Sequence, residues 1–125
     1  MNKLKDDCFR NILGIKVLDV KDGYSKMSLK VKKEHTNIAG FTHGGVIFSL
    51  ADCAFAEAVN FGEKKAVAIQ VSINYLRPTS EGDLLTAEAT TISDTRTLAL
   101  CSVIVRKEMK DVAIFSGLAY KISNS

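Results

Sequence analysis

The chain has 125 residues, of which 46% are apolar and 25% charged, and its net charge is +3. This length suits a single domain, residues 1–125, and the composition is that of a globular protein rather than a disordered one. Lysines and acidic residues alternate along the chain, which disfavours nucleic-acid binding. A small positive surplus is compatible with an anionic small-molecule substrate.

Three scattered cysteines, Cys8, Cys53 and Cys101, show no pair at metal-binding spacing, and the chain has only two histidines. A zinc site therefore lacks ligands, and we expect no metal. Buried free thiols are typical of a reducing compartment. The charged N-terminus shows no apolar region of a signal peptide, so we expect a cytoplasmic protein.

The first third of the chain alternates short elements with turns. We expect a short amphipathic helix over 6–13, a strand over 15–20 and, after an Asp-Gly hairpin turn, a second strand over 26–31. A polar loop over 34–42, which contains a glycine, then leads into the stretch 43–60, the longest apolar segment of the chain.

Residues 43–60 favour a helix that is apolar on almost every side, interrupted only by Ser49, Asp52 and Glu57. Such a helix is buried on every side. At roughly 22 Å it is short for a membrane span and carries an acid in its middle, so no membrane partner is expected. Gly62 is expected to end the helix. Asp52 is the anomaly, because a buried carboxylate is costly unless it is bonded or used.

The rest of the chain reads as strands. Apolar residues alternate strictly from Val67 to Tyr75, the strongest strand signal present, and further strands are expected over 84–93, 97–106 and 112–122. An antiparallel sheet curled around one long helix is the simplest architecture for this order, and it belongs to the α+β class.

Polar and flexible residues gather where the long helix begins: Asn37, His43, Gly44 and Gly45. A helix N-terminus carries unpaired N–H groups and a partial positive charge, and glycine lets a ligand approach the backbone closely. This arrangement favours binding of an oxyanion, either a phosphate or the oxygen of a carbonyl under attack.

The spacing of Gly45 and Asp52 predicts an oligomer. Seven helical residues turn through ~700°, so both residues face one side, but they lie roughly 10 Å apart along the axis. A carboxylate that acts on a carbonyl bound at Gly45 must come within ~3–3.5 Å of it or act through one water. We therefore predict an obligate dimer in which two antiparallel helices share two composite sites.

Several motifs lie between His35 and Tyr120. They are His35-Thr-Asn37, Gly40, His43-Gly-Gly45, Phe48, Leu50-Ala-Asp52, Ala54-Phe-Ala56, Asn60, Tyr75-Leu-Arg-Pro78, Gly82-Asp83 and Phe115-Ser-Gly117. Together they resemble the hotdog-fold acyl-CoA thioesterases, in particular the PaaI-like (phenylacetate-pathway) branch of the 4-hydroxybenzoyl-CoA thioesterase superfamily.

The resemblance implies hydrolysis of a small or aryl acyl-CoA to a carboxylate and CoA, with no cofactor beyond the CoA of the substrate. It implies that Asp52 is the nucleophile or the general base, and that the backbone N–H of Gly45 polarises the thioester carbonyl. Asn37 is expected to orient water or substrate, and His43 to lie near the thioester. Homodimers, often paired into tetramers, are implied as well. The substrate or CoA contacts expected are Gly44, Asn60, Phe61, Arg77, Arg96 and Thr97.

Other interpretations remain open. Asp52 can be structural if it is bonded to a hydroxyl such as that of Ser49, Asn37 can simply shape its turn, and Arg77 and Arg96 can be solvated surface charges. In function, the alternatives are a non-catalytic acyl-CoA-binding protein and a hotdog hydratase or dehydratase, because a fold does not determine a function.

Overall fold

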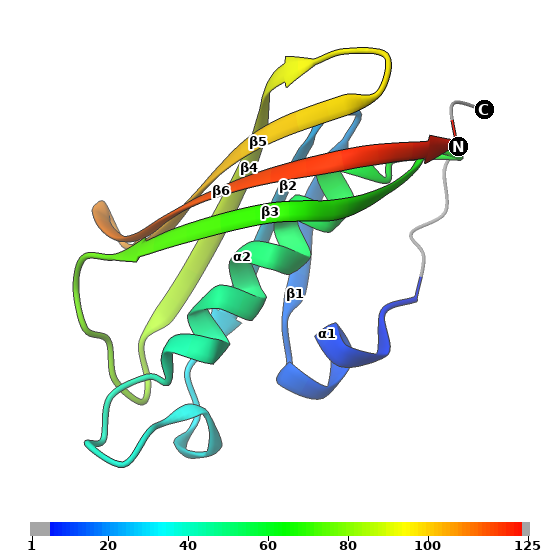
Figure 1. Cartoon of the computed structure of the whole chain (residues 1–125). Coiled ribbons are helices and arrows are strands. Elements are labelled where there is room, and N and C mark those ends of the chain that lie inside the picture. The colour runs from blue at the N-terminus through cyan, green and yellow to red at the C-terminus, as the bar shows by residue number, and fades with distance from the viewer. Residues whose placement is uncertain (1–5, 124–125) are drawn as a thin grey trace.

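The computed structural model describes residues 6–123 as a curved sheet around one long helix (Figure 1). This confirms the expected α+β hotdog architecture of two strands, one long helix and four strands. The elements are α1 (Cys8–Leu13), β1 (Lys16–Lys21), β2 (Tyr24–Lys30), a 3₁₀ turn (Lys33–His35), α2 (Gly44–Val59), β3 (Lys65–Tyr75), β4 (Leu84–Asp94), β5 (Leu98–Lys107) and β6 (Lys110–Ser123).

The six strands form a single sheet in the order β1-β2-β4-β5-β6-β3, and every neighbouring pair is antiparallel. The predicted Asp22-Gly23 turn joins β1 to β2, and Gly23 has a φ of 77°, which the tight turn requires. Strands β1 and β3 are the two edges. Among residues 6–123, the edge strand β3 pairs only with β6, so its outer backbone groups have no partner strand there.

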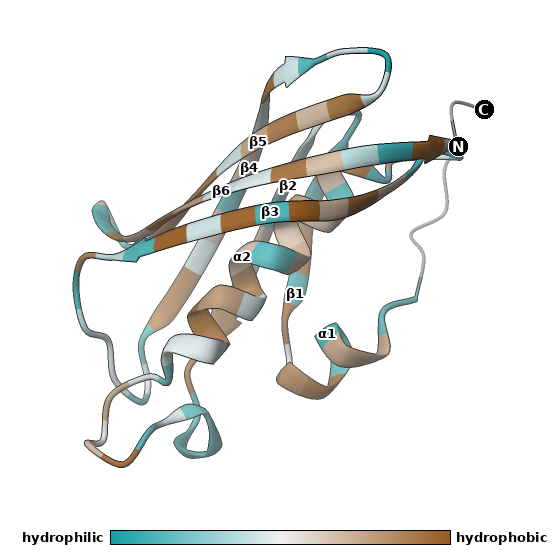
Figure 2. Cartoon of the chain, viewed as in Figure 1, coloured by the Kyte–Doolittle hydropathy of each residue, from teal (hydrophilic) through white to brown (hydrophobic). Residues whose placement is uncertain are grey.

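Helix α2 lies in the concave face of the sheet, and most of its length is apolar (Figure 2). Phe55 of α2 and Phe115 of β6 are 2% and 0% exposed, and their ring centroids lie 5.8 Å apart. Gly117 makes this packing fit, because a Cβ atom there would lie 2.9 Å from the ring of Phe55. The glycine of the Phe115-Ser-Gly117 motif thus leaves space for an aromatic ring.

The C-terminal end of α2 differs from the expectation. Asn60, not Gly62, caps the helix, and its side-chain amide donates to the carbonyl groups of Ala56 and Ala66 at 2.9 and 3.3 Å. Its carbonyl oxygen accepts from the N–H of Ala66 at 2.9 Å. One side chain therefore both satisfies the helix end and attaches it to β3, while Gly62 lies in the turn that follows with a φ of 66°.

Two regular patterns expected from the sequence are broken. Strand β3 has a register shift between Ala68 and Gln70, a bulge that leaves Ile69 56% exposed, so the strict alternation is interrupted in mid-strand. Helix α2 is also not buried on every side in the single chain. The side formed by Gly45, Ser49, Asp52 and Ala56 stays at least partly exposed.

The N-terminal segment is attached to the core by polar contacts. Arg10 is 4% exposed, and its guanidinium pairs with Glu57 of α2 at 2.8 Å. His35 is buried as well: its Nδ1 accepts from the N–H of Lys32 at 2.9 Å and its Nε2 lies 3.0 Å from the carbonyl oxygen of Leu13. Among residues 6–123, no helix is long and apolar enough to cross a membrane.

Candidate active site

Most backbone N–H groups in the first turn of α2 already have a hydrogen-bond acceptor. The ring of His43 accepts the N–H of Gly45 at 2.9 Å, which makes His43 the N-cap. The N–H groups of Val46 and Ile47 both donate to the carbonyl oxygen of His43, at 2.9 and 3.3 Å. Within the described part of the chain, the N–H of Gly44 has no hydrogen-bond acceptor. One backbone donor is thus free, and the donor on Gly45 is held by an exposed imidazole.

A pocket of about 340 Å³ opens beside this helix end. Three of the predicted site residues, Asn37, Gly44 and Arg77, line it together with Tyr75. The Tyr75 hydroxyl donates to the carbonyl oxygen of Gly44 at 3.0 Å, and burial raises the pKa of this phenol. No functional role of Tyr75 was predicted from the sequence. The available signal was its position at the end of the longest alternating strand, next to the Arg77-Pro78 break.

Asn37 shapes the loop that leads to the helix. Its Oδ1 accepts from the N–H groups of Ala39 and Phe41 at 3.0 and 3.1 Å, and Gly40 completes the turn with a φ of 88°. The side chain of Asn37 therefore does shape this turn, as one of the two interpretations expected. The amide nitrogen of Asn37 has no acceptor among the described residues, so it remains available to a ligand in the pocket.

Asp52 lies in the second half of α2, on the partly exposed side that also carries Gly45. The Ser49 hydroxyl donates to the carbonyl oxygen of Gly45 at 2.7 Å, so it does not hold the carboxylate. No other described residue forms a hydrogen bond or ion pair with Asp52. Burial, and secondly the nearby negative charge of Asp7, raise the pKa of Asp52 above its ordinary value. The chain thus holds an unpaired carboxylate in a partly dehydrated position.

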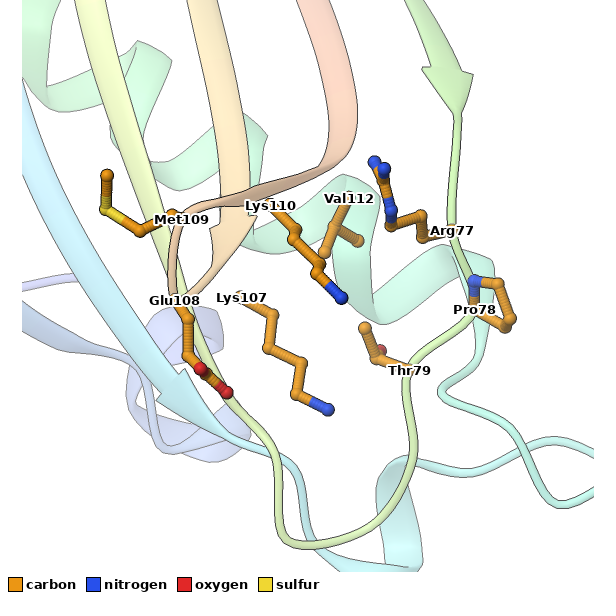
Figure 3. Close-up of a pocket in the computed structure, with 8 residues that line it drawn as sticks. All are labelled: Arg77, Pro78, Thr79, Lys107, Glu108, Met109, Lys110 and Val112. Carbon is orange, nitrogen blue, oxygen red and sulfur yellow. The ribbon is translucent and has the colours of Figure 1, made fainter.

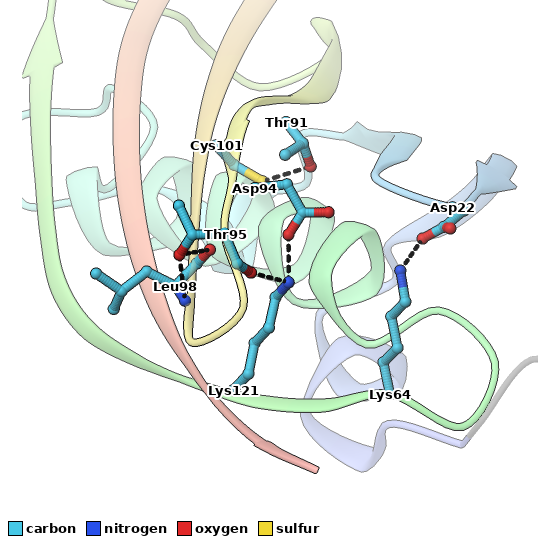
Figure 4. A network of polar contacts seen from close by, with 8 residues as sticks. All are labelled: Asp22, Lys64, Thr91, Asp94, Thr95, Leu98, Cys101 and Lys121. Atoms are coloured by element: carbon cyan, nitrogen blue, oxygen red, sulfur yellow. Dashed lines mark hydrogen bonds and ion pairs between the residues drawn. The ribbon is translucent and has the colours of Figure 1, made fainter. Parts of the chain in front are cut away.

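The remaining predicted contacts lie at the other end of the molecule. Asn60 and Phe61 follow the last turn of α2, and Arg96 and Thr97 form the turn between β4 and β5. Lys121 holds this turn: its side chain binds Asp94 and the carbonyl of Thr95, as Figure 4 shows, and its backbone N–H donates to Thr97. A single chain therefore brings Asn37, His43, Gly44, Gly45 and Arg77 together, and separates them from these four residues.

The site contains no preformed metal centre in the part of the chain that the structure describes. Within residues 6–123, no group of three or more His, Cys, Asp or Glu side chains lies in a metal-binding arrangement. The chemistry available is that of a carboxylate, an imidazole, an amide, a phenol and backbone N–H groups. This set matches acyl transfer or hydrolysis, in which a carbonyl oxygen gains negative charge.

Comparison with known proteins defines the family. The model of the thioesterase superfamily matches residues 39–114, more than half of the chain. The acyl-coenzyme A thioesterase PaaI of Escherichia coli is 34% identical over 122 residues, which cover 97% of this chain and 87% of the relative. Among solved structures, the TT0310 protein of Thermus thermophilus has a TM-score of 0.92 and 36% identity, covering 94% of this chain and all of its own.

A further structure, smu.793 of Streptococcus mutans bound to acetyl CoA, has a TM-score of 0.84 and 27% identity, with coverage of 88% of this chain and 90% of that one. The chain belongs to the thioesterase superfamily and is a thioester hydrolase with the hotdog fold. Within that superfamily it is a PaaI-like member.

Proposed function

We propose that the protein hydrolyses small or aryl acyl-CoA thioesters to a carboxylate and CoA. The name of the PaaI relative and the acetyl CoA in the smu.793 structure support CoA thioesters as the substrate class. The observation that carries the proposal for this chain is the unpaired carboxylate of Asp52, on the same side of α2 as Gly45. A carboxylate that is kept from a partner in a partly buried position is a candidate for chemistry.

The two groups do not meet within one chain. Gly45 and Asp52 are seven residues apart on α2, or roughly 10 Å along the helix axis. A two-fold axis that places two α2 helices antiparallel would bring Asp52 of the partner subunit to the Gly45 end of the first. The same symmetry would bring the Asn60 end of one chain, with Arg96 and Thr97, toward the Gly45 end of the other, where these residues can contact CoA.

Two features of the single chain support such a dimer. Strand β3 is an edge of eleven residues that exposes Val67 and Ile69 at 48% and 56%, and a long apolar edge is a template for strand pairing. The partly exposed side of α2 carries only small side chains beside Asp52, namely Gly45, Ser49 and Ala56, which permit close approach of a second helix. We infer a homodimer, and a tetramer if two dimers pair.

In the proposed reaction, the thioester carbonyl oxygen is bound at the start of α2, where it accepts from backbone N–H groups. The Asp52 carboxylate attacks the carbonyl carbon or removes a proton from an attacking water. The C–S bond breaks, the CoA thiolate leaves and is protonated, and the carboxylate product is released after water has supplied its oxygen. The amide nitrogen of Asn37 orients the water or the acyl group, and His43 contacts the thioester.

Thiol release measured with a chromogenic disulfide tests the activity across acetyl, phenylacetyl and palmitoyl CoA. We expect turnover on a subset of these substrates and a loss of at least about a hundredfold in Asp52→Asn, because the catalytic group is removed. The matched control is Glu63→Gln, which neutralises an exposed acid in the turn after α2. CoA-ester binding by the wild type without turnover would support the non-catalytic binding protein instead.

A mixed dimer tests whether the sites are shared. Co-expressed Asp52→Ala and Gly45→Pro chains, isolated as heterodimers with two different tags, should contain one intact site and one doubly damaged site. We expect about half of the wild-type activity per dimer, whereas each variant alone is inactive. An inactive heterodimer would contradict shared sites.

We also propose a cytoplasmic setting, which the free thiols of Cys8, Cys53 and Cys101 support.

A further inference from the structure

A second pocket, of about 310 Å³, lies next to the candidate active site. It shares Arg77 and Pro78 with the pocket at the start of α2, so the two pockets are separated only by this stretch of chain. Its opposite wall is the β5–β6 hairpin. Figure 3 shows that Lys107 and Lys110 reach from this hairpin toward the segment that carries Arg77.

The pocket holds three cations, Arg77, Lys107 and Lys110, against one carboxylate in its lining, Glu108. Lys107 is paired with Asp83 at 3.0 Å, which neutralises one of the three. Neither Arg77 nor Lys110 forms an ion pair with a carboxylate of the described residues. Arg77 and Lys110 therefore face the same space without an ion-pair partner among residues 6–123, and Glu108 is the one carboxylate among the residues that line the pocket.

Contacts within the chain already hold the Arg77 and Lys107 side chains in place. One nitrogen of the Arg77 guanidinium donates to the carbonyl oxygen of Asp111 at 2.8 Å, which leaves its other N–H groups for a ligand. Asp83, whose pKa is held down by the Ser80 N–H and by Lys107, ties the β5–β6 hairpin to the loop before β4. Less side-chain freedom is lost when a ligand binds to groups that are held in this way.

We propose that Arg77, Lys107 and Lys110 form an anion subsite that binds the phosphate groups of the CoA nucleotide. This inference rests on the proposed function and names residues that bind the part of the substrate remote from the thioester. Guanidinium and ammonium groups are the side chains that bind phosphate most strongly. A substrate whose thioester lies at Gly44 and Gly45 would pass Arg77 and Pro78 on its way to this pocket, because these two residues line both.

Calorimetric titration with adenosine 3′,5′-bisphosphate, which carries CoA-type phosphates and no thioester, tests the subsite without catalysis. We expect Lys110→Ala to weaken this binding about three- to tenfold, the effect of one charge-assisted contact, and Lys110→Arg to restore most of it. Lys16→Ala removes the same charge from an exposed position on β1, the other edge of the sheet, and should bind as the wild type does.

Kinetics provide a second measurement. We expect Lys110→Ala to raise KM for a CoA thioester with kcat unchanged, and to lower the ratio of kcat/KM for the CoA thioester to that for the matching pantetheine thioester, which has no nucleotide. Added salt should lower the same ratio in the wild type, because the charges are exposed and screened.

The outcomes separate the two proposals. Bisphosphate binding that depends on Lys110, in a protein that hydrolyses no thioester, would support the subsite and contradict the thioesterase proposal. Hydrolysis in which Lys110→Ala changes neither the bisphosphate affinity nor the kinetic ratio would overturn the subsite and leave the function intact. Inorganic phosphate binding as tightly as the bisphosphate would show a general anion site and overturn the nucleotide assignment.

Discussion

The ring of His43 accepts the backbone N–H of Gly45 at 2.9 Å, so the residue expected near the thioester occupies the donor expected to bind the thioester oxygen. In the single chain, the proposed oxyanion donor is therefore satisfied internally. For Gly45 to polarise a carbonyl, the imidazole must turn away or share the proton. The neighbouring N–H of Gly44 needs no such change.

Substitution of His43 separates its capping role from a substrate role. His43→Asn supplies another good N-cap acceptor, so we expect a nearly unchanged melting temperature and a fall in kcat/KM of about tenfold, as for the loss of a transition-state contact. His43→Ala should lose about 1 kcal/mol of stability as well. If His43→Asn is as active as the wild type, the imidazole is only a helix cap.

Ionisation of the Asp52 carboxyl group is expected to affect activity and stability in opposite directions. Its pKa is raised above 3.8 in the folded chain, so the folded state holds this proton more tightly than the unfolded state does. The contribution of Asp52 to the free energy of unfolding is therefore greatest below pH 3.8 and decreases as pH rises through the folded-state pKa. We expect Asp52→Asn to be inactive in the proposed reaction and yet at least as stable as the wild type at pH 7, as measured by chemical denaturation.

The same shift determines the acidic limb of the activity profile. Since the proposed reaction uses the carboxylate form of Asp52, kcat/KM should rise with pH through a pKa above 3.8. Replacing Asp7, the second cause of the shift, by Asn should move this limb to lower pH. A limb that does not move would show that burial alone raises the pKa of Asp52.

Gly117 should be intolerant of any side chain. A Cβ at this position would meet two ring atoms of Phe55 at 2.9 Å, and Phe55 is held by Phe115. We expect Gly117→Ala to lower the free energy of unfolding by about 1–3 kcal/mol, as overpacking does. Ser116→Ala, at the exposed neighbouring position, is the matched control. Equal stability of the two variants would contradict this account of the packing.

Substitution of one partner of the Arg10–Glu57 ion pair should lower the free energy of unfolding. Glu57→Gln removes the negative charge that lies 2.8 Å from the buried Arg10 guanidinium, and we expect a loss of about 1–3 kcal/mol. The double variant Arg10→Met/Glu57→Leu should lose much less, because both charges are removed and apolar volume is retained. Urea unfolding of the wild type, Arg10→Met, Glu57→Leu and the double variant forms a double-mutant cycle, and additive losses would show that the two residues do not interact.

Much of the architecture is predictable because periodicity and burial agree. The apolar stretch around Asp52 is too long for a strand, so a helix is expected there. In β2 to β6, apolar and polar residues alternate, so only one face of each strand can be buried. The end of α2 was not predictable in the same way. Asn60 and Gly62 are both plausible caps, and the choice depends on hydrogen bonds to Ala66, which lies in the next strand.

The residues that line the candidate site were easier to predict from the sequence than the contacts that these residues make. Three of the residues named from the motif, Asn37, Gly44 and Arg77, line one pocket in the structure. No pattern indicates that Lys107 and Lys110, some thirty residues beyond Arg77, form the wall of the next pocket. That proximity arises because β6 turns back and its start lies beside the end of β3, where Tyr75 pairs with Ala113.

His35 connects three segments that are separate along the chain. Its ring bonds to Lys32 and Leu13, and its carbonyl oxygen accepts the N–H of His43 at 2.8 Å. The exit of β2, the end of α1 and the N-cap of α2 should therefore open together. Amide hydrogen exchange at Lys32 and His43 should slow to a common rate, and replacing His35 should speed both while exchange within β5 stays unchanged.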